Sequence, residues 1–225
     1  ATTAAAPSAN LSCFAPEAQA SAAQFANLHV PSPEWQDQII YFVMTDRFAD
    51  GDPSNNDQGA GEYDPQDFSR FNGGDLQGVI DKLDYIEGLG ATAVWVTPPV
   101  SNQWWDPLVQ FGGYHGYWAE NFAATDPHFG TVETYQTLAD ALHGRGMYLI
   151  QDIVANHTGN FFTYQGADGK SSYDAADPAK GVRFNTDSVP VAKPSRPPFD
   201  MNDPTDPAQR AAAIYHWTPT IVDGS

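Results

Sequence analysis

The chain has 225 residues, of which 41% are hydrophobic and 13% aromatic, enough to build a folded core. Its 28 acidic residues exceed its 10 basic ones, and the formal charge of −18 repels phosphate backbones and anionic surfaces, so we expect neither nucleic acid nor a membrane as partner. An acidic chain with 6 Trp, 10 Tyr and 13 Phe suits a neutral polar ligand that stacks on rings, such as a sugar, although half or more of these rings are expected in the core.

Residues 1–36 form a predicted N-terminal tail rich in Ala, Ser, Thr and Pro. The tail lacks a basic segment followed by an apolar one, and so resembles a mature N-terminus after signal removal. We therefore expect a secreted or periplasmic protein, although a cytoplasmic protein with a flexible tail would look similar. Cys13 is the only cysteine, so no disulfide can form within the chain.

The first predicted strand is the apolar run Gln38–Thr45, which is typical of a strand buried on both faces of a parallel sheet. Residues 46–74 follow as a long loop of Asp, Asn, Gly and Pro, and a loop of this length is usually functional. Helical spacing then begins at Asp75 and ends at Gly88 and Gly90. Ala93–Val96 forms the second predicted strand.

Residues 100–130 are predicted to be a second long loop, rich in aromatic residues. Helical spacing resumes at Tyr135 and stops at Gly144 and Gly146, and Met147–Val154 is the third predicted strand. Long loops follow strands and short ones follow helices, as in a (β/α)8 barrel. A doubly wound nucleotide-binding sheet shares the alternation, but no G-x-G-x-x-G follows the first strand.

The third strand delivers an acid, an amide and an imidazole at its carboxyl end, namely Asp152, Asn156 and His157. A β/α barrel keeps its chemistry at this end of its strands. Residues 158–225 are rich in Gly, Pro, Asp, Ser and Thr, and Pro207 to Trp217 is their single helical hint. We therefore divide the chain into a tail (1–36), three β/α units (37–157) and an irregular subdomain (158–225).

Several stretches together resemble the α-amylase superfamily of glycoside hydrolases and transglycosylases. They are T-D-R-F-A-D-G-D at 45–52, G-G-D-L-Q-G at 73–78, G-A-T-A-V-W-V-T-P at 90–98, Y-H-G-Y-W at 114–118 and D-I-V-A-N-H at 152–157. The resemblance implies the N-terminal part of a (β/α)8 catalytic barrel, an α/β fold, with an irregular domain B inserted after the third strand.

The resemblance also implies substrate-binding roles. His157 matches a histidine that hydrogen-bonds the reacting sugar, Tyr117 a tyrosine that stacks beneath that sugar, and Asp152 an acid that orients the site. His115 and Trp118 match neighbours in the same pocket. A flat phenol ring covers the apolar face of a sugar, and imidazole can bond to its hydroxyls. Trp104 and Trp105 are either further sugar platforms or packing residues of the loop.

The loop after the first strand offers hard oxygen ligands at close spacing, Asp50, Asp52, Asn55 and Asn56, which suit Ca²⁺. The spacing is not that of an EF-hand. The loop resembles the N-terminal calcium site of cyclodextrin glucanotransferases, which implies that Gly73, through its carbonyl, and Asp75 complete the shell. The alternative is an Asx-rich turn without metal. Asn156 matches a ligand of a second calcium, with Asp200 as a candidate partner.

The resemblance places the catalytic nucleophile and acid, together with a supporting aspartate and an arginine, on the fourth, fifth and seventh strands of the barrel, while three strands are predicted before residue 225. No catalytic carboxylate is therefore expected within this segment, which we expect to be either part of a longer sequence or a processed fragment.

The predicted function is that of a monomeric, retaining glycoside hydrolase, an α-amylase acting on α-1,4 links of starch or maltodextrins, with an α-glucan or maltooligosaccharide as substrate. A cyclodextrin glucanotransferase or another α-glucosyl transferase is the alternative. A non-catalytic carbohydrate-binding homologue is a third.

Overall fold

The computed structural model describes residues 32–107, 109–164, 182–184, 189–190, 194 and 197–215. Contacts group the chain into two units, Ala1–Asp37 and Gln38–Ser225. In the first unit, the described residues include a short 3₁₀ helix, η2 (Trp35–Asp37). All other helices and strands among the described residues belong to the second unit. None of the helices among the described residues is both long and apolar enough to cross a membrane.

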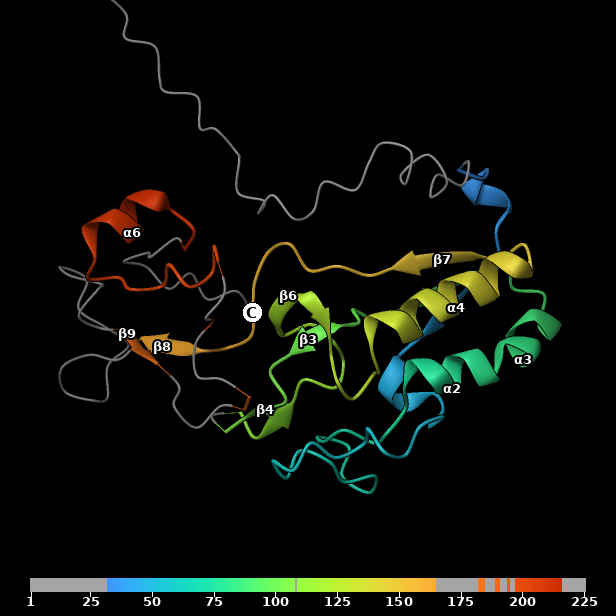
Figure 1. The fold of residues 1–225 in the computed structure, drawn as a ribbon, viewed down its shortest axis with the longest axis horizontal. Coiled ribbons are helices and arrows are strands. Elements are labelled where there is room, and N and C mark those ends of the chain that lie inside the picture. The colour runs from blue at the N-terminus through green and yellow to red at the C-terminus, as the bar shows by residue number, and fades with distance from the viewer. Residues whose placement is uncertain are drawn as a thin grey trace, which may run out of the picture. The chain divides into compact units, whose positions relative to one another are not determined.

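The second unit contains a parallel three-stranded sheet, of which β7 is labelled in Figure 1. Its strands are β1 (Ile40–Val43), β2 (Ala93–Val96) and β7 (Tyr148–Gln151), in the order β1-β2-β7. The register aligns Val43 with Val96 and Val96 with Gln151, so all three strands end at one edge. The three strands lie where the apolar runs predict them, although the first and third are shorter than predicted.

Three helices connect these strands, and two of them begin at a residue whose side chain caps the helix. Asp75 caps α2 (Leu76–Asp81) by accepting the Gly78 N–H at 2.6 Å, and Thr131 and Thr134 form a capping box at the start of α4 (Val132–Gly144). The predicted helix from Asp75 to Gly88 is interrupted. Lys82 has φ −106° and ψ 8°, which separates α2 from α3 (Leu83–Gly88).

The two faces of the sheet differ in burial. Val43, Val94 and Val96 on one face pack with apolar side chains of all three helices, including Leu76, Leu83, Ile86, Leu138 and Leu142. On the other face, Phe42 is 47% exposed and Trp95 38%, and their rings meet edge to face at 5.3 Å. The sequence predicts strands buried on both faces, whereas the described structure buries one.

Residues 100–125 contain short antiparallel strands where the sequence predicts a loop. β3 (Val100–Asn102) pairs with β6 (Ala119–Thr125), and β4 (Trp105–Asp106) pairs with β5 (Phe111–Gly112). The register of β3 and β6 shifts twice within three residues. Such shifts erase the alternation of apolar and polar residues by which a strand is recognised in sequence, so the loop prediction was wrong here.

Beyond β7, the described residues include the antiparallel pair β8 (Phe162–Tyr164) and β9 (Val182–Phe184). Helix α6 (Pro207–Ala212) begins with proline, as predicted, and Asp206 caps it. It ends early because Ala213 adopts the left-handed conformation with φ 54°. The last predicted helical residues, His216 and Trp217, lie outside the described residues, and the proposed division of the chain at residues 37 and 158 stays a prediction.

Candidate functional site

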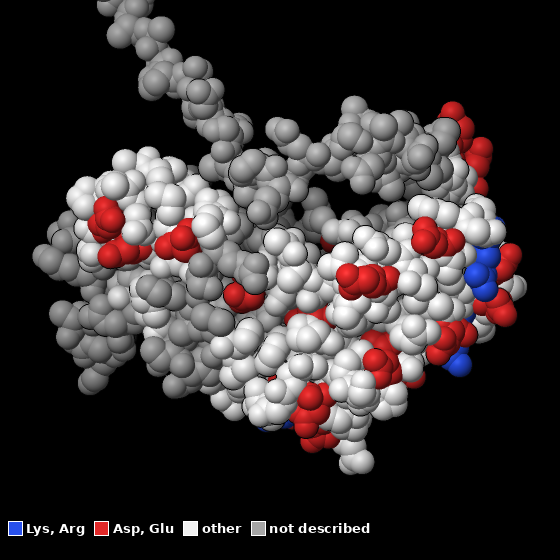
Figure 2. Space-filling model, in the orientation of Figure 1, with Lys and Arg blue, Asp and Glu red and all other residues white. Residues whose placement is uncertain are grey.

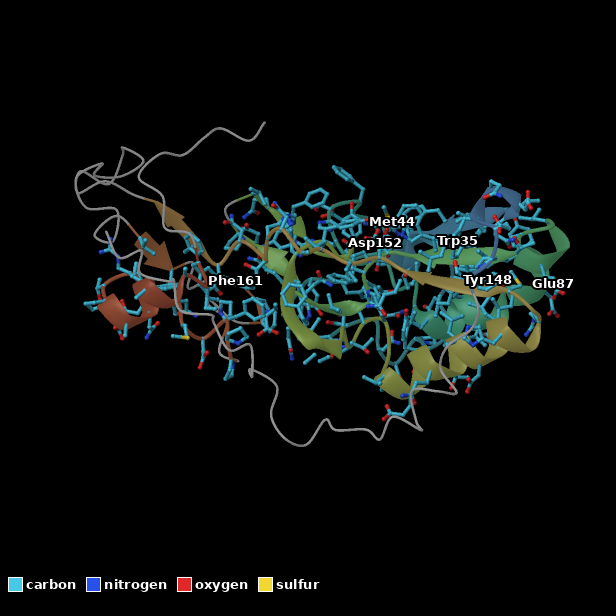
Figure 3. The ribbon with its side chains drawn as sticks, turned by 90° about the horizontal axis from the view of Figure 1, so that it is seen from above. Trp35, Met44, Glu87, Tyr148, Asp152 and Phe161 are labelled. Carbon is cyan, nitrogen blue, oxygen red and sulfur yellow. The ribbon has the colours of Figure 1, made fainter. Side chains whose placement is uncertain are left out.

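The candidate site lies at the carboxyl edge of the parallel sheet. Met44 follows β1 and Asp152 follows β7 at this edge, while Tyr148, where β7 begins, and Glu87 of α3 lie toward the opposite edge (Figure 3). The chain after each strand therefore carries its polar residues to one place. Acidic side chains are spread over the face shown in Figure 2, and basic ones are few.

Asp152 receives two hydrogen bonds at the edge of the sheet. The Tyr117 hydroxyl donates to its Oδ2 at 2.9 Å, and the Trp95 indole N–H donates to the same oxygen at 3.1 Å. Burial, then the hydrogen bond and the charge of Asp152, raise the pKa of Tyr117 to about 12, so the phenol stays a donor at neutral pH. Trp95 was missed by the sequence analysis, although alternation along β2 places it opposite Val94 and Val96.

Two histidines contact Tyr117. His157 Nε2 lies 3.0 Å from the Tyr117 carbonyl, which can only accept, so this nitrogen carries the proton. His115 Nδ1 accepts the Tyr117 N–H at 3.0 Å, and the two rings stack with centroids 5.7 Å apart. Burial, and then repulsion by Arg47 and His157, lower the pKa of His115 to about 4. His115 is therefore neutral at physiological pH, as its accepting nitrogen requires.

A cavity of about 940 Å³ opens beside β7. His157, Asn156 and Trp118 line it together with apolar residues that include Ile153, Phe162 and Phe199. The Trp118 ring meets His115 edge to face at 4.9 Å. The structure thus brings the predicted substrate-binding residues into one cluster, with His157 and Trp118 on the cavity wall and with Tyr117 in contact with His115, Asp152 and His157.

The predicted calcium ligands share one loop, but their side chains have different partners. Asp75 accepts the N–H groups of Gly51 at 3.1 Å and Asp52 at 2.8 Å, in addition to capping α2. Asp50 accepts from Asn56 Nδ2 at 2.7 Å, and Asp52 accepts from the Ser54 hydroxyl at 2.6 Å. Within the described residues, no group of three or more His, Cys, Asp or Glu side chains could hold a metal ion.

The chemistry of this loop nevertheless fits a hard cation. Asn55 Oδ1 and Asn56 Oδ1 are buried without any hydrogen-bond donor, and a buried unpaired carbonyl oxygen is unfavourable unless something binds it. Gly73 lies against Asn56 with φ +96°, and a Cβ there would come within 3.0 Å of the Asn56 amide. Only glycine fits at this position. The set Asn55, Asn56, Asp50, Asp75 and the Gly73 backbone could therefore hold Ca²⁺.

The predicted second calcium site is less complete. Asn156 lies on the wall of the cavity and is exposed, and Asp200 is exposed in the turn that follows Pro197. No hydrogen bond or ion pair joins these two residues in the part of the chain that the structure describes. Their role as ligands stays a prediction.

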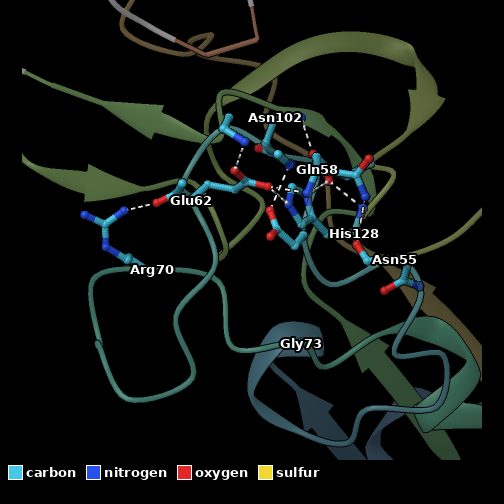
Figure 4. A network of polar contacts seen from close by, with 12 residues as sticks. Asn55, Gln58, Glu62, Arg70, Gly73, Asn102 and His128 are labelled. Atoms are coloured by element: carbon cyan, nitrogen blue, oxygen red, sulfur yellow. Dashed lines mark hydrogen bonds and ion pairs between the residues drawn. The ribbon is translucent and has the colours of Figure 1, made fainter.

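A buried polar network lies between the loop and the strand-end cluster, and the sequence analysis missed it (Figure 4). His128 Nδ1 lies 2.8 Å from Asp126 Oδ1, and His128 Nε2 lies 3.1 Å from Glu62 Oε1. Burial opposes protonation of His128, but the two carboxylates outweigh it and raise its pKa to about 9. Burial likewise opposes ionisation of Glu62, yet His128 and nearby N–H groups lower its pKa to about 2.

The two tryptophans of residues 104–105 pack against protein. Trp104 belongs to the periphery of the core and meets His128 edge to face at 5.2 Å. The Arg70 guanidinium lies 4.2 Å from the Trp105 ring centre, a cation–π contact. These contacts favour the packing interpretation over the sugar-platform interpretation.

Asp46 and Arg47, in the short 3₁₀ helix η3 (Thr45–Arg47) after β1, form another charged pair, in which Asp46 is buried and Arg47 partly exposed. Asp46 accepts the Asn72 N–H at 2.9 Å, and Arg47 Nη1 lies 3.2 Å from Asp46 Oδ2. The Arg47 guanidinium also covers the Tyr114 ring at 3.7 Å. Burial raises the pKa of Asp46 to about 6, against the lowering effects of Asn72 and Arg47.

Parallel strands joined through helices, with polar and aromatic side chains gathered at the carboxyl edge, define an α/β catalytic-domain architecture. The family model "Alpha amylase, catalytic domain" matches residues 42–203. The chain therefore belongs to the α-amylase family, and the described strands and helices form part of its (β/α)8 fold.

Named relatives are similar to parts of this chain. A beta/alpha-amylase of Paenibacillus polymyxa is 41% identical over 144 residues, which are 64% of this chain and 12% of the relative. Alpha-amylase mde5 of Schizosaccharomyces pombe is 44% identical over 127 residues, which are 56% of this chain and 23% of the relative. The chain thus spans less than a quarter of the length of either relative.

A solved structure shows a similar fold. The gamma-CGTase from alkalophilic Bacillus clarkii superposes with a TM-score of 0.52 at 33% identity, covering 63% of this chain and 25% of that chain.

Proposed function

We propose that the protein is a retaining glycoside hydrolase, an α-amylase acting on α-1,4 links of starch or maltodextrins. The observation that carries the proposal is the cluster of Tyr117, Asp152 and His157. Tyr117 is held by its hydroxyl at 2.9 Å from Asp152 and by its carbonyl at 3.0 Å from His157. A phenol ring fixed at both ends presents a rigid face on which a pyranose can stack.

Each residue of the cluster has a role in this proposal. Tyr117 supports the apolar face of the sugar, Asp152 holds the phenol in place, and the exposed His157 imidazole offers Nδ1 to a sugar hydroxyl. His115, kept neutral, orients Tyr117 through its backbone N–H. Trp118 extends the apolar wall. The two carboxylates that break and form the glycosidic bond would come from later strands of the barrel.

Calcium belongs to the proposal as a structural ion. When bound, it would neutralise the carboxylates of the loop and supply the positive partner that the buried oxygens of Asn55 and Asn56 lack. The proposed ligands of this ion are Asp50, Asn55, Asn56, Gly73 and Asp75, with Asp52 next to them. A second calcium ion is proposed to bind Asn156. We also propose a domain B within residues 158–225, secretion or a periplasmic location, and a monomer.

The proposal is tested with the full-length protein, maltodextrins and proton NMR of the anomeric signals. We expect linear products that first appear as the α-anomer, which is the signature of retention. Cyclic products would favour glucanotransferase activity instead, an option supported by the likeness to a gamma-CGTase. Sugar binding without turnover would identify a non-catalytic homologue.

A further inference from the structure

The network of Glu62, His128 and Asp126 is the part of the molecule for which the sugar-binding proposal has no role. His128 is 1% exposed, and both of its ring nitrogens are bonded. The Phe71 ring stacks on its imidazole with centroids 3.9 Å apart. A histidine enclosed in this way cannot reach a ligand, so any functional effect must act through its neighbours.

One arm of the network reaches the candidate sugar pocket. Asp126 Oδ2 accepts the Asn102 N–H at 2.8 Å, and Asn102 Oδ1 accepts the Trp118 N–H at 3.0 Å. The Trp118 carbonyl in turn accepts the Gln103 N–H at 2.8 Å. Both backbone polar groups of Trp118 are therefore fixed by the segment that Asp126 holds, and Trp118 directly follows Tyr117.

The other arm reaches the candidate calcium loop. The Glu62 carboxylate accepts the N–H groups of Gln58 at 2.5 Å and Ala60 at 2.8 Å. The Gln58 side chain donates to the Asn55 carbonyl at 2.8 Å. Figure 4 shows Asn55, Gln58, Glu62, His128 and Asn102 within this one polar network. His128 is the link between the two arms, since it bonds to both carboxylates.

We propose that His128 is a positioning residue that joins the loop of residues 55–62 to the backbone of Trp118, the residue next to Tyr117. The expected change in KM rests on the proposed sugar-binding function, whereas the expected change in hydrogen exchange does not. Without the imidazolium, the buried carboxylates of Glu62 and Asp126 would have no positive charge between them. Their repulsion would push the two arms of the network apart.

The test compares His128→Gln and Asp126→Asn with His143→Gln in the full-length protein. His143 lies in the last turn of α4 and is exposed, so it receives the same substitution without a buried partner. Asp126→Asn keeps the volume but leaves a single oxygen for three N–H groups, those of the Asn102 backbone, the His128 backbone and the His128 ring. It therefore provides a second route to the same break if His128→Gln does not fold.

The primary measurement is hydrogen–deuterium exchange of peptides covering residues 55–62 and 114–121, under conditions where each variant is folded. We expect faster exchange in both peptides for both network variants, with helix α4 and the His143→Gln protein unchanged. The kinetic measurement is KM against kcat on maltodextrins, with an expected rise in KM of about tenfold and a smaller change in kcat, as for a misplaced binding surface.

Two results would overturn the proposal. Unchanged exchange at residues 114–121 in a folded network variant would show that Trp118 does not depend on His128. A variant that is less stable but keeps its KM well below its melting temperature would show that His128 only supports the fold. An inactive wild-type protein would instead refute the proposed function, and the exchange measurement would still decide the positioning role.

Discussion

Two polar clusters of this chain, which Asn102 links through hydrogen bonds to Asp126 and Trp118, are built in opposite ways. In the network of Glu62, His128 and Asp126, each ring nitrogen and each carboxylate has a partner, and the histidine is buried. In the strand-end cluster, His157 and Asn156 are exposed on a cavity wall, and Asp152 is partly accessible. Polar groups with complete sets of partners hold the structure, while polar groups with open positions are available to a ligand.

The histidines show the same contrast in their charge. His128 lies between two carboxylates, and its pKa is raised to about 9 despite burial. His115 is partly buried near Arg47 and His157, and burial first, then these two neighbours, lower its pKa to about 4. The same side chain is thus a fixed cation in the network and a neutral hydrogen-bond acceptor in the site.

The largest expected effect is on stability, from removal of the network cation. We expect His128→Gln to lower the free energy of unfolding by about 3–5 kcal/mol at pH 6, since it leaves buried carboxylates unpaired. The matched exposed change, His143→Gln, should alter it by no more than about 0.5 kcal/mol. Denaturant unfolding of the three proteins measures both values, and equal stabilities would contradict the view that the network holds the fold.

The stability difference between wild type and His128→Gln should depend on pH. The folded pKa of His128 is about 9 against a reference of 6.5, so its contribution is complete below 6.5 and is lost as the pH rises through 9. The folded pKa of Glu62 is about 2 against 4.5, so its contribution is present above 4.5 and is lost as the pH falls through 2. We expect the largest difference between pH 4.5 and 6.5. A difference that is constant from pH 3 to 10 would be inconsistent with a charged His128.

The next effect concerns the strand-end cluster. We expect His157→Ala in the full-length enzyme to lower kcat/KM on maltodextrins by about tenfold to a hundredfold, because a hydrogen bond that tightens in the transition state is lost. Its melting temperature should stay within about 2 °C of wild type, since the side chain is exposed. Unchanged kcat/KM would remove His157 from the site.

A smaller effect is expected at Tyr117. Tyr117→Phe keeps the stacking ring but removes one of the two donors to Asp152, leaving Trp95 in place. We expect kcat/KM to fall by about threefold to tenfold, the scale of one hydrogen bond to a charged group that is partly replaced by water. Tyr117→Ala, which removes the ring as well, should be the more impaired variant. Equal losses in the two variants would show that the ring face contributes nothing to binding.

The smallest effect is expected from removal of calcium. Chelation should lower the melting temperature by a few degrees, because Asn55 Oδ1 and Asn56 Oδ1 would again lack partners. Asp50→Ala should reduce the response to added Ca²⁺, while Asp57→Ala, at an exposed residue of the same loop, should not. A loop that melts identically with and without chelator in all three proteins is only a polar turn.

The sequence predicts the parallel strands because they are continuous apolar runs, and it places Asp152 and His157 at a strand end for the same reason. It does not predict β3 and β6, whose register shifts hide any alternation. The Glu62–His128 contact joins residues 66 positions apart, and no periodicity connects them. The other contact of His128, with Asp126, lies within the D-P-H sequence at 126–128. This sequence is equally typical of an ordinary turn.

The position of Trp95 makes its intrinsic fluorescence a reporter of this site. Its indole N–H donates to Asp152 at 3.1 Å while the ring is 38% exposed, and indole emission responds to both hydrogen bonding and surrounding polarity. In the proposed function, a sugar that stacks on Tyr117 would alter both, because Tyr117 and Trp95 donate to the same oxygen of Asp152. The wavelength of tryptophan emission can therefore be followed during an oligosaccharide titration without a label, and a Trp95→Phe protein separates this signal from that of the other five tryptophans.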